Sequence, residues 1–208
     1  MTSLTQIRLS AATVARLGIR DVYDWHQRTW ECFPCRDGQP RDFLTRLDRK
    51  GDSFQLLIVS PAEPTRPAWC PGDCWRGPKL IPESYFSRTR YRFQLCANPT
   101  KKVAVQNPDG SFKKNSRRVP LGKREDLIAW LQRKGEQGGF SVEEDSLRII
   151  PRGREYFQKN GQTGLHTAVE FQGVLVVTDP QRFHEAFRRG VGPARAFGFG
   201  LLVIAPVR

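Results

Sequence analysis

The sequence predicts an α+β fold made of two tandem units, and three observations support this. The chain has 208 residues, of which 38% are hydrophobic, which suffices for one large core or two small ones. Its first half has the order strand, helix, strand, strand, irregular segment, strand, which is typical of the split βαβ, ferredoxin-like unit. Its second half again combines strands with amphipathic helices. We expect an N-terminal unit over residues 1–98, a basic linker and hairpin over 99–122, and a C-terminal unit over 123–208.

The elements of the first unit follow from the spacing of its apolar residues. Polar and apolar residues alternate over residues 4–9, which predicts a strand. Residues 19–33 predict a helix with one broad apolar face, for which Asp21 is a suitable N-cap and Pro34 a stop. Residues 61–82 are rich in Pro, Gly and Cys and predict no convincing helix. Further strands are predicted over residues 43–48, 54–60 and 88–97, the last of which completes the first unit.

The second unit begins with an amphipathic helix. Over residues 123–134, Leu127, Trp130 and Leu131 share one face. Asp179 and Pro180 are typical of the N-cap and first position of another helix, which we expect over residues 180–189. Strands are predicted over residues 140–150, 165–177 and 201–206.

The charge of the chain indicates a polyanionic partner. Thirty-four Lys and Arg residues against 21 Asp and Glu residues give a net charge of +13, which is typical of a nucleic-acid binder, although a basic surface that aids solubility is the alternative. The excess is concentrated over residues 99–124, where Asp109 is the single acid. The basic residues of this segment are Lys101, Lys102, Lys113, Lys114, Arg117, Arg118, Lys123 and Arg124.

Neither a membrane span nor a secretion signal is expected. No apolar run approaches the roughly 18 residues that a spanning helix needs. Residues 1–20 lack the basic segment followed by an apolar one that is typical of a signal peptide. We therefore expect a cytoplasmic protein with no membrane partner.

The cysteines permit a zinc site but do not favour one. Cys32 and Cys35, with Cys70 and Cys74, could supply four thiolates. Cys32 falls on the predicted helix beside aromatic residues, however, and buried or loop thiols without a ligand are the simpler interpretation. We therefore predict no metal and no cofactor.

A tyrosine and a histidine on the first helix are the strongest candidates for chemistry. Tyr23 and His26 are three residues apart, so their side chains meet on one helical face, where a phenol and an imidazole can move protons to or from a hydroxyl or phosphate. A core histidine bonded to a carbonyl is the alternative for His26. His166 and His184 have no neighbours that suggest catalysis.

A glycine-rich segment precedes the last strand. Residues 190–200 contain four glycines, at 190, 192, 198 and 200, and Arg195 adds a positive charge. Glycines allow backbone N–H groups to approach a phosphate closely, although they also serve helix caps and tight strand starts.

Four segments in order resemble a known family. They are Asp-Val-Tyr-Asp-Trp-His-Gln at 21–27, Arg-Phe-Gln-Leu-Cys-Ala-Asn-Pro-Thr-Lys at 92–101, Ala-Trp-Leu-Gln-Arg-Lys at 129–134, and the glycine-rich segment. Together they resemble the CasE family, the CRISPR precursor-RNA endoribonuclease of type I-E Cascade. The resemblance implies two tandem ferredoxin-like (RRM-like) domains. It also implies metal-independent cleavage at the 3′ base of the repeat stem-loop, leaving a 5′-hydroxyl and a 2′,3′-cyclic phosphate.

The resemblance also implies site residues and partners. Tyr23 and His26 fall on the catalytic positions, with His26 as general base or general acid. The partners would be the CRISPR precursor RNA stem-loop, the mature guide RNA and other Cascade subunits. Arg195 departs from the family, in which lysine is common, and residues 61–82 are atypical. The expected RNA-binding residues are Lys101, Lys102, Lys113, Lys114, Arg117, Arg118, Arg148, Arg152, Arg154, Lys159, Gly190, Gly192, Arg195, Gly198 and Gly200.

Two other functions stay open on the sequence. A non-catalytic RNA-binding subunit of a ribonucleoprotein would explain the charge and the order of elements. A zinc-dependent DNA- or RNA-binding protein would use the four paired cysteines.

Overall fold

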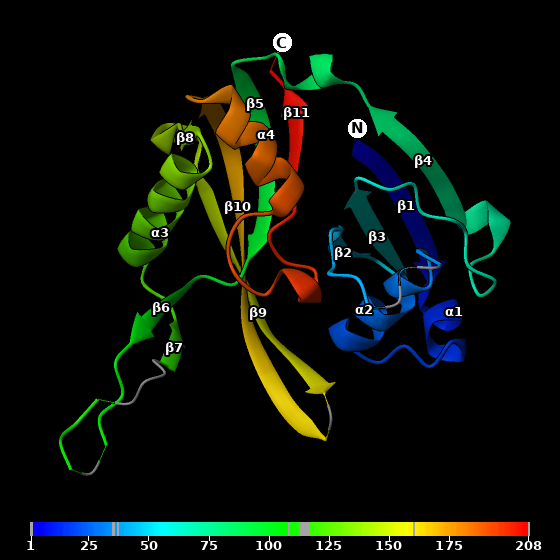
Figure 1. Cartoon of the computed structure of the whole chain (residues 1–208), viewed down its shortest axis with the longest axis horizontal. Coiled ribbons are helices and arrows are strands. Elements are labelled where there is room, and N and C mark those ends of the chain that lie inside the picture. Colours follow the sequence, from blue (N-terminus) through cyan, green and yellow to red (C-terminus); the bar gives the residue numbers. More distant parts are fainter. Residues whose placement is uncertain are drawn as a thin grey trace.

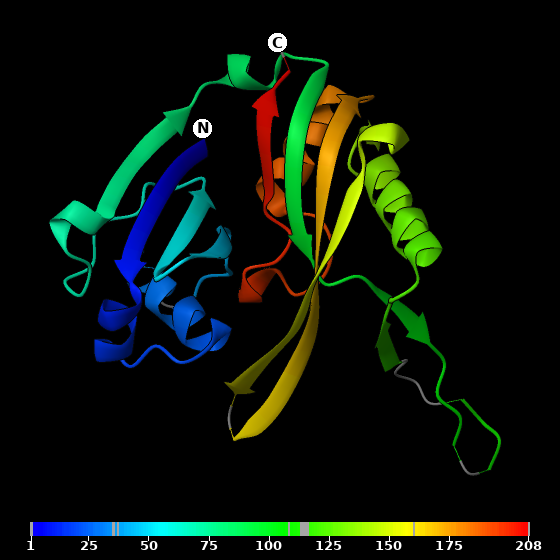
Figure 2. The ribbon, with the colours of Figure 1, turned by 180° about the vertical axis from the view of Figure 1, so that it is seen from behind.

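Two antiparallel sheets, each with its own helices, lie side by side in the computed structural model of the chain (Figure 1; Figure 2 shows the opposite side). The structure describes residues 2–34, 36, 38–107, 109–112, 117–159 and 161–207, with the backbone alone described at residue 159. Among the described residues, no helix is both long and apolar enough to cross a membrane.

The first sheet has the strand order β2-β3-β1-β4. With β1 leading through helices into the β2–β3 hairpin, this is the ferredoxin-like arrangement that the sequence predicts. Its strands are β1 (Thr2–Ser10), β2 (Leu44–Lys50), β3 (Ser53–Ser60) and β4 (Trp75–Ile81), and its helices are α1 (Ala11–Arg16) and α2 (Val22–Trp30).

The second sheet has the order β11-β5-β10-β8, with β9 also pairing with β10. If β8 and β9 are counted together as one edge strand, the second sheet has the same strand arrangement as the first. The prediction of two tandem ferredoxin-like units is therefore confirmed. Its strands are β5 (Arg90–Ala97), β8 (Phe140–Val142), β9 (Arg148–Lys159), β10 (Gln162–Val177) and β11 (Leu202–Pro206), and its helices are α3 (Arg124–Gln137) and α4 (Pro180–Arg189).

One strand assignment was wrong. The strand predicted over 88–97 forms as β5, but it pairs with β10 and β11 in the second sheet. The first sheet is completed instead by β4, within the segment 61–82 for which no element was predicted. Because β4 is largely exposed and contains Gly77 and Pro78, it lacks the alternating pattern that identifies a strand. The expected unit of residues 1–98 therefore includes a strand of the second sheet.

Other differences concern element ends. The helix predicted over 19–33 forms as the shorter α2, which begins after its N-cap Asp21, whose side chain accepts hydrogen bonds from the backbone N–H groups of Tyr23 and Asp24. Helix α1 precedes it and was not predicted. The strand predicted over 140–150 is interrupted by a short 3-10 helix, Glu144–Ser146. Helix α4 has the predicted bounds, and Asp179 caps it.

Each unit has its own apolar core. In the first, Ile7 and Ile58 of the sheet are fully buried with Trp25 of α2. In the second, Trp130 of α3 stacks on Phe171 of β10, with ring centroids 5.8 Å apart. The helices thereby bury one face of each sheet.

A buried ion-pair network joins the two units. Arg46 of β2 donates to Glu170 of β10 at 3.2 Å, and its guanidinium also pairs with Asp48. Arg152 of β9 donates to the same glutamate. Burial raises the pKa of Glu170, but hydrogen bonds and the positive charges around it outweigh this, so that the pKa is lowered overall.

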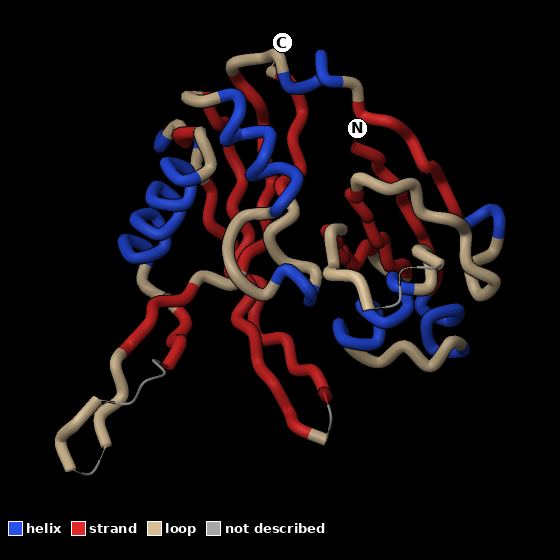
Figure 3. Tube along the Cα trace, viewed as in Figure 1, coloured by secondary structure: helices blue, strands red, loops and turns tan. Residues whose placement is uncertain are grey.

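Two hairpins extend beyond the second sheet (Figures 1 and 3). One joins β6 (Thr100–Val103) to β7 (Arg117–Pro120). The other is the far end of the β9–β10 ladder, past an irregularity at Ala168 and Val169 where Gly153 has φ +98°. We call residues 153–159 and 161–168 the β9–β10 ribbon.

Candidate active site

Tyr23 and His26 lie together on α2, as their spacing predicts. Asp21 starts the helix one residue before Val22, so both side chains fall in its first two turns. Their ring centroids are 6.4 Å apart, and both side chains are half-buried. The helix faces the core with Trp25 and Thr29 instead. The His26 side chain is therefore half-buried rather than part of the core, although its Nδ1 atom has almost no exposed surface.

Aromatic neighbours hold the imidazole of His26. Trp30 lies one turn further along α2 and its indole N–H donates to Nε2 of His26 at 3.2 Å. Nε2 consequently accepts a hydrogen bond and carries no proton in this arrangement. The buried ring of Phe43 lies 6.2 Å from the imidazole between centroids. Packing therefore sets the orientation of the ring.

The phenol of Tyr23 faces a segment of the second unit. Its hydroxyl oxygen accepts a hydrogen bond from Nε2 of Gln27 at 3.0 Å. Its ring centroid lies 6.4 Å from that of Phe197, in the short 3-10 helix Arg195–Phe197 of the glycine-rich segment. The tandem arrangement thus brings residues 190–200 to the tyrosine.

The glycines of this segment permit close packing of the backbone. Val191 N–H donates to Gly200 O at 2.8 Å, which draws the two ends of the loop together. All four glycines have positive φ, which disfavours other residues. A Cβ atom would lie 2.9 Å from Leu44 at position 190, 2.9 Å from Trp130 at 192 and 2.8 Å from Val191 O at 200, whereas at Gly198 the nearest atom is at 3.8 Å. Three of the four predicted glycines are therefore required by packing.

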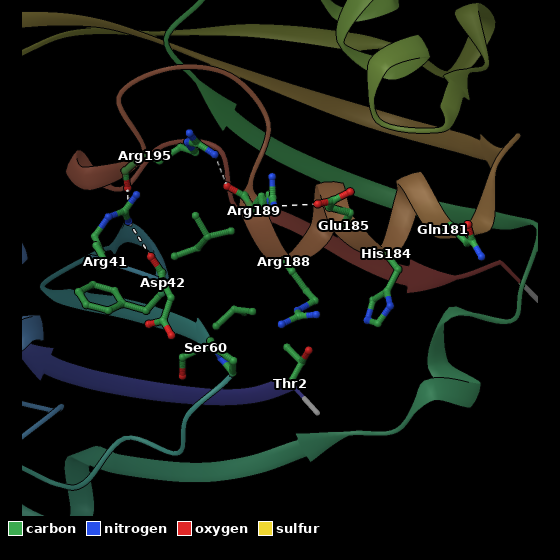
Figure 4. A pocket seen from close by; sticks show the side chains of 14 residues that line it. Thr2, Arg41, Asp42, Ser60, Gln181, His184, Glu185, Arg188, Arg189 and Arg195 are labelled. Carbon is green, nitrogen blue, oxygen red and sulfur yellow. Dashed lines mark hydrogen bonds and ion pairs between the residues drawn. The ribbon is translucent and has the colours of Figure 1, made fainter. Parts of the chain in front are cut away.

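Arg195 lines a cavity of about 590 Å³ between the two units (Figure 4). Arg41 crosses the gap and donates to the carbonyl of Arg195 at 3.0 Å, while Arg188 extends from α4. Arg41, Arg188 and Arg195 form no ion pair with any described residue. Burial, together with the charge of Arg195, lowers the pKa of Arg41. The lining thus carries excess positive charge that an anion would neutralise.

The β6–β7 hairpin carries exposed cations. Lys101 and Lys102 lie on β6, and Arg117 and Arg118 on β7. Lys102 is directly opposite Arg118 in the ladder, and like charges at such positions repel one another. This arrangement suits a hairpin that meets a polyanion. Lys113 and Lys114, also predicted here, lie outside the described residues, as does the side chain of Lys159.

The cations of β9 are not equivalent. Arg148 and Arg154 are exposed and form no ion pair within the described part of the chain. Arg152, predicted to bind RNA, is instead engaged by Glu170 and is 44% exposed. Its charge is therefore already neutralised in part.

The thiols do not resemble a formed metal site. Cys32 and Cys70 are buried among apolar residues, and burial raises their pKa values to about 12 and about 11, so both stay protonated near neutral pH. Across the described ranges, no group of three or more His, Cys, Asp or Glu side chains is arranged to hold a metal. Cys35 lies outside those ranges, so the arrangement of all four cysteines is not defined.

The sequence did not identify several neighbours of the pair. Trp30 could have been noticed, because it is four residues from His26 on the same helix. Phe43 and Phe197 come from distant segments, and no local pattern links them to α2.

Comparison with known proteins gives matches over nearly the whole chain. A family model described as CRISPR associated protein matches residues 3–206. The CRISPR system Cascade subunit CasE of Escherichia coli (strain K12) is 32% identical over 203 residues, covering 96% of this chain and 99% of that protein. The CRISPR-associated endoribonuclease Cse3 of Thermus thermophilus is 34% identical over 234 residues, covering 98% and 99%.

Solved structures agree with the sequence matches. CRISPR endoribonuclease Cse3 bound to a 19-nucleotide RNA superposes with a TM-score of 0.79 at 27% identity, covering 99% of this chain and 100% of that one. Thermus thermophilus Cse3 bound to an RNA representing a pre-cleavage complex gives 0.72 at 28% identity, with 99% of each chain covered. Cas6e from Escherichia coli gives 0.73 at 29% identity, with both chains covered completely.

Proposed function

The chain belongs to the CasE family of CRISPR-associated proteins, and we propose that it is a metal-independent endoribonuclease that cleaves CRISPR precursor RNA at the 3′ base of the repeat stem-loop. We further propose that it stays bound to the mature guide RNA as a Cascade subunit in the cytoplasm. The observation that carries the proposal is the half-buried pair of Tyr23 and His26 beside the glycine-rich segment, in a chain that also carries two cationic hairpins. Relatives named as an endoribonuclease and as a Cascade subunit support it.

The substrate supplies its own nucleophile. The 2′-hydroxyl attacks the adjacent phosphorus, and the bond between phosphorus and the 5′-oxygen breaks. One proton leaves the 2′-oxygen and one reaches the 5′-oxygen. The products are a 2′,3′-cyclic phosphate and a 5′-hydroxyl, and no co-reactant is consumed. The protein has to align these groups, move protons and stabilise charge.

His26 performs one of the two proton transfers, and Tyr23 orients the reacting group. Trp30 and Phe43 hold the imidazole, so its approach to the ribose is defined by packing. In the proposed reaction the hydroxyl of Tyr23, whose oxygen accepts from Gln27, donates a hydrogen bond to a phosphate oxygen. The guanidinium of Arg195 donates to the carbonyl of Arg189 at 2.7 Å and lines the cavity between the units, so it adds positive potential there.

The exposed cations bind the stem through its phosphates. A-form RNA has a deep, narrow major groove that side chains read poorly, so Lys102 and Arg118 on the β6–β7 hairpin contact the backbone. Arg148 and Arg154 on β9 provide a second row. Strong contacts of this kind slow the release of product, and we therefore expect close to a single turnover for each protein molecule.

The test is cleavage of a labelled repeat stem-loop by the purified chain and by His26→Ala. The variant should lose cleavage while its affinity for the stem-loop stays within a few-fold. Equal loss of cleavage and affinity would make His26 a structural residue. A 2′-deoxy nucleotide at the scissile position should block the reaction, and EDTA should leave it intact. Failure of the unmodified chain to cleave would favour a non-catalytic RNA-binding subunit.

A further inference from the structure

Asp21 uses its two carboxylate oxygens for different segments. Oδ1 accepts from the backbone N–H groups of Tyr23 at 2.8 Å and Asp24 at 3.0 Å, which caps α2. Oδ2 accepts from the backbone N–H of Gln158 at 2.9 Å, across 137 residues of sequence. Only the hydrogen bonds to Oδ1 are needed to start the helix. The hydrogen bond from Gln158 to Oδ2 joins the catalytic helix to the other unit.

Gln158 lies near the end of the β9–β10 ribbon. Among the described strands, β9 pairs with β10 alone, so the outer edge of β9 has backbone groups that no strand satisfies. On its inner edge Gln158 is opposite Thr163, and their side chains are hydrogen-bonded at 2.7 Å. A two-stranded ribbon is marginally stable alone. The contact with Asp21 therefore holds its outer edge against α2, where Figures 1 and 2 both show the two elements adjacent.

Aromatic contacts continue from this attachment to Tyr23. Phe157, next to Gln158, packs on Phe197 with ring centroids 4.3 Å apart. Phe197 in turn lies 6.4 Å from Tyr23. A shift of the ribbon would consequently move Phe197 and change the surroundings of the tyrosine.

We propose that Asp21 is a positioning residue for cleavage, because its Oδ2 fixes the cationic β9–β10 ribbon at a set place relative to Tyr23 and His26. This inference rests on the proposed function. The ribbon carries Arg154 toward the RNA, while the reacting groups lie on α2 in the other unit. The Asp21 carboxylate therefore connects the ribbon, which binds the RNA stem, to the residues that act at the base of the stem. Binding of the stem to the ribbon then also aligns the scissile phosphate with the reacting groups.

Two variants of Asp21 distinguish the capping of α2 from the hydrogen bond to Gln158. Asp21→Asn retains an oxygen for the N–H groups of Tyr23 and Asp24 but places an N–H₂ group opposite the Gln158 donor. Asp21→Ser retains a cap and provides no second acceptor. In both variants the single-turnover cleavage rate should fall at least tenfold, while the dissociation constant for the stem-loop stays within threefold. Amide hydrogen exchange at Gln158 should accelerate.

Asp179 offers a matched control. It caps α4 through Gln181 and Arg182 in the same way, and it accepts no hydrogen bond from another segment of the described chain. Asp179→Asn should cleave within twofold of the unmodified protein. The inference is overturned if Asp21→Asn cleaves within twofold, if rate and affinity fall in equal proportion, or if Asp179→Asn loses as much. Absence of cleavage by the unmodified protein would instead refute the proposed function.

Discussion

Replacing Gly200 with alanine tests whether the glycine-rich segment depends on backbone packing. At this position φ is +86°, and a Cβ would lie 2.8 Å from Val191 O and 3.2 Å from Cγ of Arg195. The carbonyl of Val191 cannot move away easily, because the N–H of the same residue is bonded to Gly200 O at 2.8 Å. Gly198 has nearly the same φ, +83°, but its nearest atom would be 3.8 Å away.

The two glycines therefore separate backbone strain from collision. A left-handed conformation costs alanine about 1–2 kcal/mol, and both variants incur this cost. Forcing an extra methyl group into packed surroundings adds typically about 1–3 kcal/mol, which applies to Gly200 alone. The gain from restricting the unfolded chain is the same for both variants and cancels in the comparison. Gly200→Ala should thus be roughly 1–3 kcal/mol less stable than Gly198→Ala.

Urea unfolding, followed by tryptophan fluorescence, measures the difference between the two variants. The midpoint for Gly200→Ala should lie clearly below that for Gly198→Ala. Because the segment holds Phe197 against Tyr23, Gly200→Ala should also lower the rate of stem-loop cleavage more than Gly198→Ala does. Equal midpoints for the two variants would refute the packing argument and favour a segment whose glycines serve the ligand.

Three further outcomes are expected. Glu170→Gln removes a charge that neutralises buried Arg46, and urea unfolding should show a loss of about 3 kcal/mol in the free energy of unfolding. A loss below about 1 kcal/mol would show that the ion-pair network contributes little to stability. Burial lowers the pKa of His166 in the folded chain below its usual 6.5, so the unfolded chain binds a proton more readily and the free energy of unfolding should fall as pH drops below about 6.5. The same fall in His166→Asn would show that another group causes it. Arg118→Ala should reduce the slope of log affinity against log salt by about one, and an unchanged slope would remove this residue from the phosphate contacts.

Much of the local structure could be predicted from the sequence. Asp21 and Asp179 cap helices as expected, and α4 has the predicted bounds. The meeting of Tyr23 and His26 follows from helical spacing. Each of these features depends on residues a few positions apart, so a local pattern contains the information that specifies it.

The pairing of strands and the contacts between units could not be predicted in this way. Strand β5 has a clear alternating pattern, but the pattern does not state which sheet it joins, and exposed β4 has no comparable pattern. The ion pair of Arg46 with Glu170 spans 124 residues, and the link from Asp21 to Gln158 spans 137. The sequence by itself therefore determined most of the elements, the caps of α2 and α4, the candidate catalytic pair and the basic character. The tertiary structure decided which strands share a sheet, which charges are neutralised and which segments stand beside Tyr23, because these depend on register and burial between residues far apart in the chain.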